Sequence, residues 1–347
     1  MAVASRIRFR PRSASAYDWR FPCSAPVLDF GVLRTDLLGR GSSRHCYALG
    51  SPVVSVNVTC CCTLSKRAAV KFGFILPNNW GIADPVAVAN VGVEAEEFGL
   101  ESVWVNHHIV NAGYIADRLG NRPYHDALTV LTWVASQTST IKLGTSVLVM
   151  PYLHPMATAK ALATLDLMSG GRVIPGLGVG SLPEENEILG VIYDGRGSFG
   201  DEFIDVMQAL WTEEAASYEG EHFQFADVIA SPKPAQAVMP VWVGGSGAPA
   251  RRRAAAYGTG WHPMCSVDGL AHRMPAMVEA LESQGRERTS LTVAPRVDVT
   301  DLPDIAAVEA WRKAGADQLV VGVSSPDLAD HRSGLAHVAT LAQATAN

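Results

Sequence analysis

The chain has 347 residues, 48% of them hydrophobic, and a formal net charge of −6 at pH 7. No uninterrupted apolar stretch approaches the roughly 20 residues of a membrane-spanning helix, so we expect no membrane span. The charge is unevenly divided, with +7 on residues 1–69 and −13 on residues 70–347, and the acidic longer part disfavours nucleic-acid binding.

Residues 1–69 differ from the rest of the chain in composition. They contain ten Lys or Arg against three acidic residues, and five of the six cysteines. Cys60-Cys61-Cys62 lacks the spacing of a metal knuckle. Three interpretations stay open: an organelle transit peptide, a basic arm that binds anionic partners, and upstream sequence translated ahead of a true start at Val70. We predict that 1–69 is a disordered or mistranslated extension and that 70–347 is the folded domain.

From Val70 the sequence alternates short apolar runs with amphipathic helices. Asp84-Pro85 predicts the start of the first helix and Gly99 its end, while Pro155 and Gly170 predict the ends of a later one. Further helices are predicted at 126–136 and 199–211, and a hairpin-and-loop excursion at 217–238. The predicted strands are 70–76, 102–105, 141–149, 172–178, 240–244, 260–262, 291–299 and 318–323.

Eight strands alternating with helices predict an α/β fold, a (β/α)8 TIM barrel, which typically has about 250 residues. A doubly wound sheet is the alternative, but Gly176-x-Gly178-x-Gly180 lacks the spacing of a dinucleotide-binding loop. Barrel enzymes carry their functional residues at the carboxyl ends of the strands. Those ends here carry Asn106-His107-His108, Thr145-Ser146-Val147, Val179-Gly180-Ser181, Gly244-Gly245-Ser246-Gly247 and His262.

The glycine-rich loop Gly244-Gly245-Ser246-Gly247 leads directly into a helix that begins near Pro249. Unpaired backbone N–H groups and the helix dipole would converge there, which favours a phosphate-binding loop. A glycine-rich turn without a ligand fits the same residues. Arg251 and Arg252 would add positive charge, whereas we expect Arg253 to lie on a solvated helix face.

His107 and His108 follow the second predicted strand. An imidazole can exchange a proton with a substrate oxygen while a hydride moves at the neighbouring carbon. Adjacent residues on a strand point to opposite faces, which disfavours a shared metal ion, and we predict no metal. A purely structural role for the two histidines stays open.

Many segments from Val70 to about His262 resemble the luciferase-like flavin and deazaflavin oxidoreductases. The resemblance is greatest to the actinobacterial branch that uses coenzyme F420, and it fades beyond residue 265. It implies a hydride transfer between F420, an 8-hydroxy-5-deazaflavin, and a small organic substrate. The segments that carry it are 71–78, 102–105, 143–151, 161–172, 176–180, 209–211, 231–234, 240–245 and 260–263.

The resemblance also implies roles for individual residues. It places a non-prolyl cis peptide at Ser146-Val147 beneath the cofactor ring, the cofactor phosphate on the glycine-rich loop, and His108 as the catalytic acid or base. The cofactor-binding residues predicted in this way are His107, Thr145, Ser146, Val147, Gly180, Ser181, Gly244, Gly245, Ser246 and Gly247.

Two positions depart from the pattern of the resembling enzymes. His107 stands where they usually have an acidic residue, and Ser181 stands where the sugar dehydrogenases have a catalytic glutamate. Glu184 or Glu185 would either replace that glutamate or cap the helix after Pro183. We therefore assign no catalytic carboxylate from the sequence.

Alternative functions and partners stay open. An FMN-dependent monooxygenase of the same superfamily is one alternative, and a non-catalytic flavin-binding barrel is another. A homodimer is possible if Phe203, Leu210, Tyr218, Phe223 and Phe225 form an outer surface, although the same residues could close the core of the barrel. Cys265, the one cysteine after Val70, is consistent with a reducing cytoplasm. The substrate is not predicted by any motif.

Overall fold

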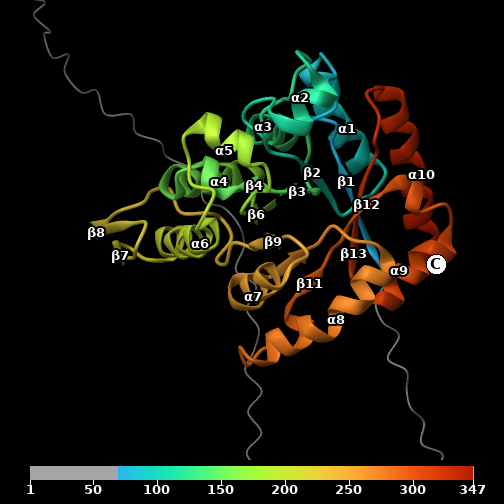
Figure 1. Cartoon of the computed structure of the whole chain (residues 1–347). Coiled ribbons are helices and arrows are strands. Elements are labelled where there is room, and N and C mark those ends of the chain that lie inside the picture. Colours follow the sequence, from blue (N-terminus) through green and yellow to red (C-terminus); the bar gives the residue numbers. More distant parts are fainter. Residues whose placement is uncertain (1–68, 347) are drawn as a thin grey trace, which may run out of the picture. The chain divides into compact units, whose positions relative to one another are not determined.

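The computed structural model describes residues 69–346, so the predictions for residues 1–68 lie outside the described part of the chain. Parallel strands form a ring that is surrounded by helices (Figure 1). This arrangement confirms the predicted (β/α)8 barrel. The strands are β1 (Lys71–Ile75), β2 (Ser102–Val105), β3 (Lys142–Thr145), β4 (Leu148–Val149), β5 (Val173–Ile174), β6 (Gly176–Gly178), β9 (Trp242–Gly244), β10 (Gly260–His262), β11 (Thr292–Val293), β12 (Arg296–Asp298) and β13 (Gln318–Gly322).

Three of the eight predicted strands are interrupted. The third, fourth and seventh are each split into two short strands, β3 with β4, β5 with β6 and β11 with β12. Hydrogen bonding follows the order β12-β13-β1-β2-β3-β5 in one sheet and β11-β10-β9-β6-β4 in the other. Each split strand begins in one sheet and continues in the other, and this continuity closes the two sheets into one barrel.

The helices begin and end largely where the sequence predicts. Asp84 accepts a hydrogen bond from the N–H of Val86 at 2.9 Å, and Asp126 accepts one from Thr129 at 2.8 Å. Gly170 ends its helix in the left-handed conformation. The helices are α1 (Pro85–Glu97), α2 (Gly113–Leu119), α3 (Ala127–Gln137), α4 (Pro155–Ser169), α5 (Pro183–Leu189), α6 (Arg196–Thr212), α7 (Ala248–Tyr257), α8 (Val267–Glu282), α9 (Ile305–Ala314) and α10 (Leu328–Ala346). None of these helices combines the length and apolar character that a membrane span requires.

Helix α2 is absent from the sequence prediction. It has only seven residues, too few to show a helical hydrophobic period. Its buried side chains, Ile115 and Leu119, pack in a small separate cluster with Ala112 and Leu182. The helix is therefore fixed by contact with the residue before α5, far away in the sequence.

Two tryptophans fill the interior of the barrel. The rings of Trp104 and Trp242 are 4.7 Å apart between centroids, and both side chains are buried. A Cβ on Gly144 would lie 2.3 Å from Trp104 Cε3, and one on Gly260 would lie 2.4 Å from Trp242 Cγ. Glycine at these strand positions makes room for the rings, so the interior is solid below the mouth of the barrel.

The aromatic residues of the predicted excursion cover the protein's own core. Phe203 and Leu210 of α6 are fully buried, and Tyr218, Phe223 and Phe225 pack against the same cluster. Of the two interpretations of these residues, closure of the core is the one that their burial supports.

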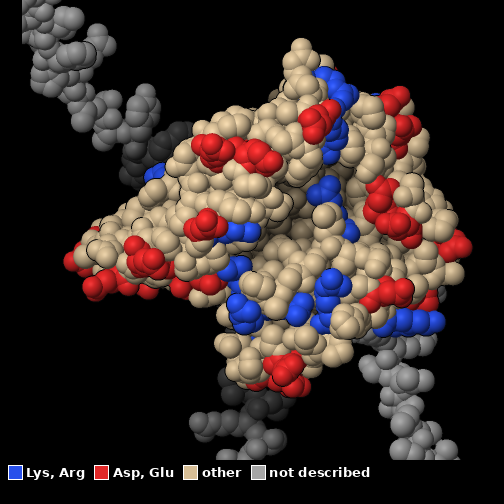
Figure 2. All heavy atoms as spheres, viewed as in Figure 1, with Lys and Arg blue, Asp and Glu red and all other residues tan. Residues whose placement is uncertain are grey.

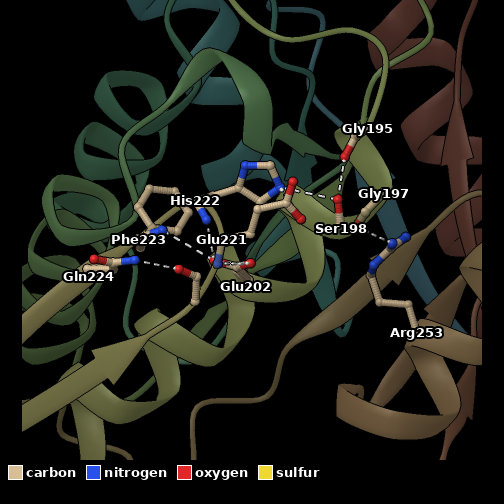
Figure 3. Close-up of polar contacts among 10 residues, drawn as sticks. Gly195, Gly197, Ser198, Glu202, Glu221, His222, Phe223, Gln224 and Arg253 are labelled. Atoms are coloured by element: carbon tan, nitrogen blue, oxygen red, sulfur yellow. Dashed lines mark hydrogen bonds and ion pairs between the residues drawn. The ribbon is translucent and has the colours of Figure 1, made fainter.

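The excursion itself is a hairpin of β7 (Ala216–Glu219) and β8 (Gln224–Val228), anchored to α6 by Glu202 (Figure 3). The Glu202 carboxylate accepts hydrogen bonds from the N–H groups of Glu221, His222 and Phe223 at 2.8, 2.9 and 3.2 Å. Glu202, Glu221 and His222 bring ligand-type atoms within 4.8 Å of one another. Because three N–H groups already occupy the Glu202 oxygens, we interpret the cluster as a hairpin anchor.

One prediction for α7 is wrong. Arg253 is buried rather than solvated, and its guanidinium donates to Asp201 Oδ1 at 2.5 Å. It also donates to the carbonyl of Gly197 at 2.8 Å (Figure 3). The ion pair joins α7 to α6. The sequence pattern of three consecutive arginines does not show which one faces the neighbouring helix.

Glu96 links the end of α1 to the segment before β3. Its carboxylate accepts backbone hydrogen bonds from Ser139, Thr140 and Ile141 at 2.9, 2.6 and 2.9 Å. Burial opposes ionisation, but these bonds outweigh it and lower the pKa of Glu96 from 4.5 to about 2.

We expect Glu96→Gln to reduce the pH dependence of stability. A depressed folded-state pKa gives stability that is present above the unfolded value of 4.5 and is lost as the pH falls toward 2. The wild type should therefore exceed the variant in unfolding free energy at pH 7, and the difference should shrink on acidification, as measured by urea unfolding at several pH values. Glu97→Gln, at an exposed neighbour, serves as the control. A difference that is independent of pH would contradict this prediction.

Candidate active site at the barrel mouth

A cavity of about 490 Å³ opens at the carboxyl ends of the barrel strands. In Figure 2 the surface is hollowed near the centre of the view, and Lys and Arg side chains gather beside the hollow. The structure brings most of the predicted site residues together in this cavity. Those that line it are His107, His108, Ser146, Val147, Gly180, Ser181, Gly244 and Gly245.

The break between β3 and β4 forms one wall of the cavity. The Ser146–Val147 peptide bond is cis, as predicted. The Val147 side chain projects between two glycines of neighbouring strands: a Cβ on Gly178 would lie 2.5 Å from its Cγ2, and one on Gly244 would lie 2.7 Å from its Cγ1. Glycine at both positions makes room for the Val147 side chain, which lines the cavity as an apolar group.

Thr145 does not line the cavity, contrary to the prediction. Its hydroxyl donates to the carbonyl of Gly176 and accepts from the N–H of the same residue, both at 2.8 Å. These bonds bridge the split strands β3 and β6. The side chain is fully buried, so Thr145 holds the barrel wall together.

The glycine-rich loop contributes to the cavity only through Gly244 and Gly245. The Ser246 hydroxyl donates to the carbonyl of Met264 at 2.7 Å, and its own carbonyl accepts from Arg251 at 3.1 Å. Gly247 is the N-cap of α7 and is exposed. Of the four predicted residues, two thus face the cavity and two lie at its outer edge.

His108 forms a hydrogen bond with Glu185 that the sequence does not reveal. Its Nδ1 contacts Oε2 of Glu185, a side chain of α5 with no solvent exposure. The other carboxylate oxygen of Glu185 accepts from the N–H groups of Ile109 and Val110 at 2.7 and 3.2 Å. Burial opposes ionisation of Glu185, but the bonds from His108 and Ile109 prevail and lower its pKa.

Glu184 and Glu185, which the sequence did not distinguish, have different environments in the structure. Glu184 is exposed, whereas Glu185 reaches across the cavity wall to the segment after β2. The N-cap residue of α5, Leu182, makes no side-chain capping hydrogen bond. Glu185 therefore orients His108. The two residues are 77 positions apart in the sequence, so no local pattern predicts their contact.

His107 has a different environment. Its Nδ1 accepts a hydrogen bond from the N–H of Val149 at 3.2 Å. Burial lowers the pKa of His107 to about 4, so the ring is neutral at pH 7. Both histidines line the same cavity, because they lie in the irregular segment after β2 rather than on the strand. Asn78 fixes this segment by donating to the carbonyl of Asn106 at 2.8 Å and accepting from its N–H at 3.0 Å.

The cavity lining also contains cations and phenols. Arg296 is partly buried, donates to Asn106 Oδ1 at 2.7 Å and forms no ion pair with a described carboxylate. Arg118 of α2 stacks on Trp80 with its guanidinium carbon 4.4 Å from the ring centroid. Tyr124 lies 5.7 Å from His108 between ring centroids. No motif in the sequence points to these residues.

Several buried polar atoms around the cavity have no hydrogen-bond partner among residues 69–346. They include Asn106 Nδ2, Asn79 Oδ1 and Tyr124 Oη. Buried polar groups are nearly always paired in folded proteins, so these atoms indicate a place for a polar ligand. A second cavity of about 410 Å³ adjoins the first and shares Met264 and Arg296 with it.

Solved structures with the same fold include several flavin and deazaflavin proteins. An F420-dependent secondary alcohol dehydrogenase in complex with an F420-acetone adduct superposes with a TM-score of 0.68 at 18% identity, over 81% of this chain and all of that one. The monooxygenase RslO1 from Streptomyces bottropensis gives a TM-score of 0.66 at 18% identity, over 78% of this chain and 98% of the other. At these identities the likeness concerns the fold.

Sequence comparison gives closer relatives. The chain is 34% identical over 211 residues to an F420-dependent glucose-6-phosphate dehydrogenase of Kineococcus radiotolerans, covering 58% of this chain and 60% of that protein. A protein of the same name from Segniliparus rotundus is 30% identical over 230 residues, covering 64% of this chain and 66% of that protein. The chain thus spans less than two thirds of the length of these relatives. The family model of the luciferase-like monooxygenases matches residues 71–345, and the chain belongs to this family.

Proposed function

We propose that the protein is an oxidoreductase that transfers a hydride between coenzyme F420 and a small organic substrate. The observation that carries the proposal is the His108–Glu185 pair in a cavity that also contains the cis peptide Ser146–Val147. The relatives named F420-dependent glucose-6-phosphate dehydrogenases support the choice of cofactor.

The residues of the cavity suit a tricyclic ring. Val147, flanked by Gly178 and Gly244, offers an apolar surface for one face of the ring. Gly180 and Gly245 have φ angles of +73° and +112°, and their backbone can approach a ligand closely without a side chain. These residues would hold the cofactor, with its phosphate toward Gly244 and Gly245.

His108 would move the proton that accompanies the hydride. The Glu185 carboxylate requires a hydrogen on Nδ1 of His108, so the lone pair of the neutral ring lies on Nε2. Nε2 can therefore accept the proton of a substrate hydroxyl, and the buried carboxylate stabilises the imidazolium that forms. When bound, the deazaflavin supplies the carbon that takes or gives the hydride. In the reverse direction, the protonated His108 donates to the carbonyl oxygen.

The substrate would carry an anionic group. Arg296 and Arg118 line the cavity, and neither forms an ion pair with a carboxylate of the described residues. A partly buried guanidinium is a strong donor to carboxylate or phosphate. The relatives are named as dehydrogenases of glucose 6-phosphate, a phosphate ester and therefore an anionic substrate. A charge-assisted hydrogen bond contributes about 1.5–3 kcal/mol, equivalent to about 10–100-fold in affinity.

The test is a fluorescence titration of the full chain with F420 and, separately, with FMN. We expect quenching at low micromolar F420 and none with FMN. The loaded protein is then assayed by deazaflavin absorbance with glucose 6-phosphate and with glucose, and we expect kcat/KM to be at least about tenfold higher for the phosphate ester. Binding of FMN alone would replace the proposal by an FMN-dependent monooxygenase. Tight F420 binding without turnover of any alcohol would favour a non-catalytic flavin-binding barrel.

A further inference from the structure

His262 lies at the end of β10 and forms part of the cavity lining. Its ring is buried and stacks on Trp104 at 5.4 Å between centroids. Each ring nitrogen has one partner. Nδ1 lies 2.6 Å from the carbonyl oxygen of Ala294, and Nε2 lies 2.9 Å from the hydroxyl oxygen of Ser146.

These two contacts determine the tautomer of His262. A carbonyl oxygen can only accept a hydrogen bond, so Nδ1 must carry the hydrogen. Burial, the largest influence on this ring, lowers the pKa of His262 to about 4, and the ring is neutral at pH 7. The second nitrogen, Nε2, therefore carries a lone pair and accepts.

The tautomer in turn orients the Ser146 hydroxyl. An Nε2 lone pair requires that Ser146 donate its only hydroxyl hydrogen to His262. No other hydrogen bond of this hydroxyl is present among residues 69–346, and Ser146 lines the cavity beside the cis peptide. After this donation, the Ser146 hydroxyl can still accept hydrogen bonds through its two oxygen lone pairs.

We propose that Ser146, oriented by His262, presents an acceptor to the bound ring and selects a ligand with an N–H group at that point. The oxidised rings of deazaflavins and flavins have one N–H on the pyrimidine edge, at N3, between two carbonyl groups that can only accept. Ser146 would therefore receive the N3 hydrogen, and His262 is a positioning residue that keeps the serine hydrogen away from the ring. The identity of the ring rests on the proposed function. The inference adds which residue of this chain recognises the ring, and through which hydrogen bond.

The experiment compares the deazaflavin chromophore at the riboflavin level with its N3-methyl derivative, which lacks the N–H group. Dissociation constants for the full chain are measured by fluorescence quenching. We expect the wild type to bind the methylated ligand about 3–10-fold more weakly, the range of one neutral hydrogen bond of about 0.5–1.5 kcal/mol. Equal affinity for the two ligands would overturn the inference without affecting the proposed function. Failure of the wild type to bind either ligand, F420 or FMN would overturn both.

Two variants separate a hydrogen bond from a steric effect of the methyl group. If Ser146 accepts from N3, Ser146→Ala weakens the parent ligand about 3–10-fold and leaves the methylated ligand unchanged. If Ser146 only crowds the methyl group, the variant leaves the parent unchanged and strengthens the methylated ligand, and the inference fails. Ser181→Ala removes another hydroxyl from the same cavity and should preserve the difference between the two ligands.

The role of His262 is tested with Ser146 intact. His262→Phe keeps a flat ring against Trp104 but removes the acceptor for the serine hydrogen. The hydroxyl then rotates freely, and we expect a smaller difference between parent and methylated ligands than in the wild type. A difference equal to that of the wild type would show that His262 does not orient Ser146. The comparison of ligands on the wild type remains decisive if this variant does not fold.

Discussion

Replacing His108 by alanine is expected to lower kcat of the proposed hydride transfer by about 10²–10⁴-fold, the usual contribution of a positioned acid or base. His108 lines the cavity, and among the described residues Glu185 is its one hydrogen-bond partner, through Nδ1. Nε2 is therefore available for the substrate oxygen. Stopped-flow or steady-state measurement of deazaflavin absorbance, with the cofactor saturating, gives the rate.

The same variant should bind F420 with nearly unchanged affinity, because the proposed ring surface is formed by Val147 and its flanking glycines. His272→Ala, at an exposed histidine of α8, controls for the loss of an imidazole elsewhere in the chain. If His108→Ala retains wild-type kcat, the histidine has only a structural role and the proposed proton transfer is wrong.

Glu185→Gln is expected to cause a similar loss in kcat, about 10²–10⁴-fold, although the side chain keeps its shape. Oε1 of Glu185 accepts from Ile109 and Val110, so the amide oxygen of glutamine will take that position. The amide NH2 group then faces Nδ1 of His108 and donates to it. This forces the other tautomer, in which Nε2 carries a hydrogen and cannot accept the substrate proton.

The mechanism of this loss can be distinguished from misfolding. The variant keeps the contacts of the glutamate with Ile109 and Val110, so we expect a native circular dichroism spectrum and unchanged F420 affinity. Glu184→Gln, at the exposed neighbour, should leave kcat unchanged. Wild-type kcat in Glu185→Gln would mean that the carboxylate does not set the tautomer of His108.

Local sequence patterns predicted most elements of the fold. Asp84 and Asp126 are helix caps, and Gly170 ends α4, because each acts on backbone groups within a few residues. Strands β2 and β10 have the predicted bounds. The order of these elements along the chain was enough to predict the barrel, since parallel strands joined by helices close in few ways.

The split strands show where this local information stops. The sequence predicted the third strand as one apolar run over 141–149, but the cis peptide at Ser146–Val147 divides it into β3 and β4. The resemblance to a known family, and not the hydrophobic pattern, predicted that peptide. Hydrophobicity predicts which residues are buried. The residues on both sides of the break are apolar, so the hydrophobic pattern does not show where the strand is divided.

The sequence by itself determined the barrel and the strand ends that form its mouth, because these follow from local caps, strand periodicity and the order of elements; the choice of His108 came from the family resemblance. Only the tertiary structure decided that Glu185 orients His108, that Arg296 has no acidic partner there, that Thr145 belongs to the wall and that Arg253 is buried. Glu185 and His108 are 77 residues apart, and Arg296 and Asn106 are 190 residues apart. Contacts of this kind depend on how α5, β12 and the segment after β2 converge in space, and no periodicity in one stretch of chain specifies them.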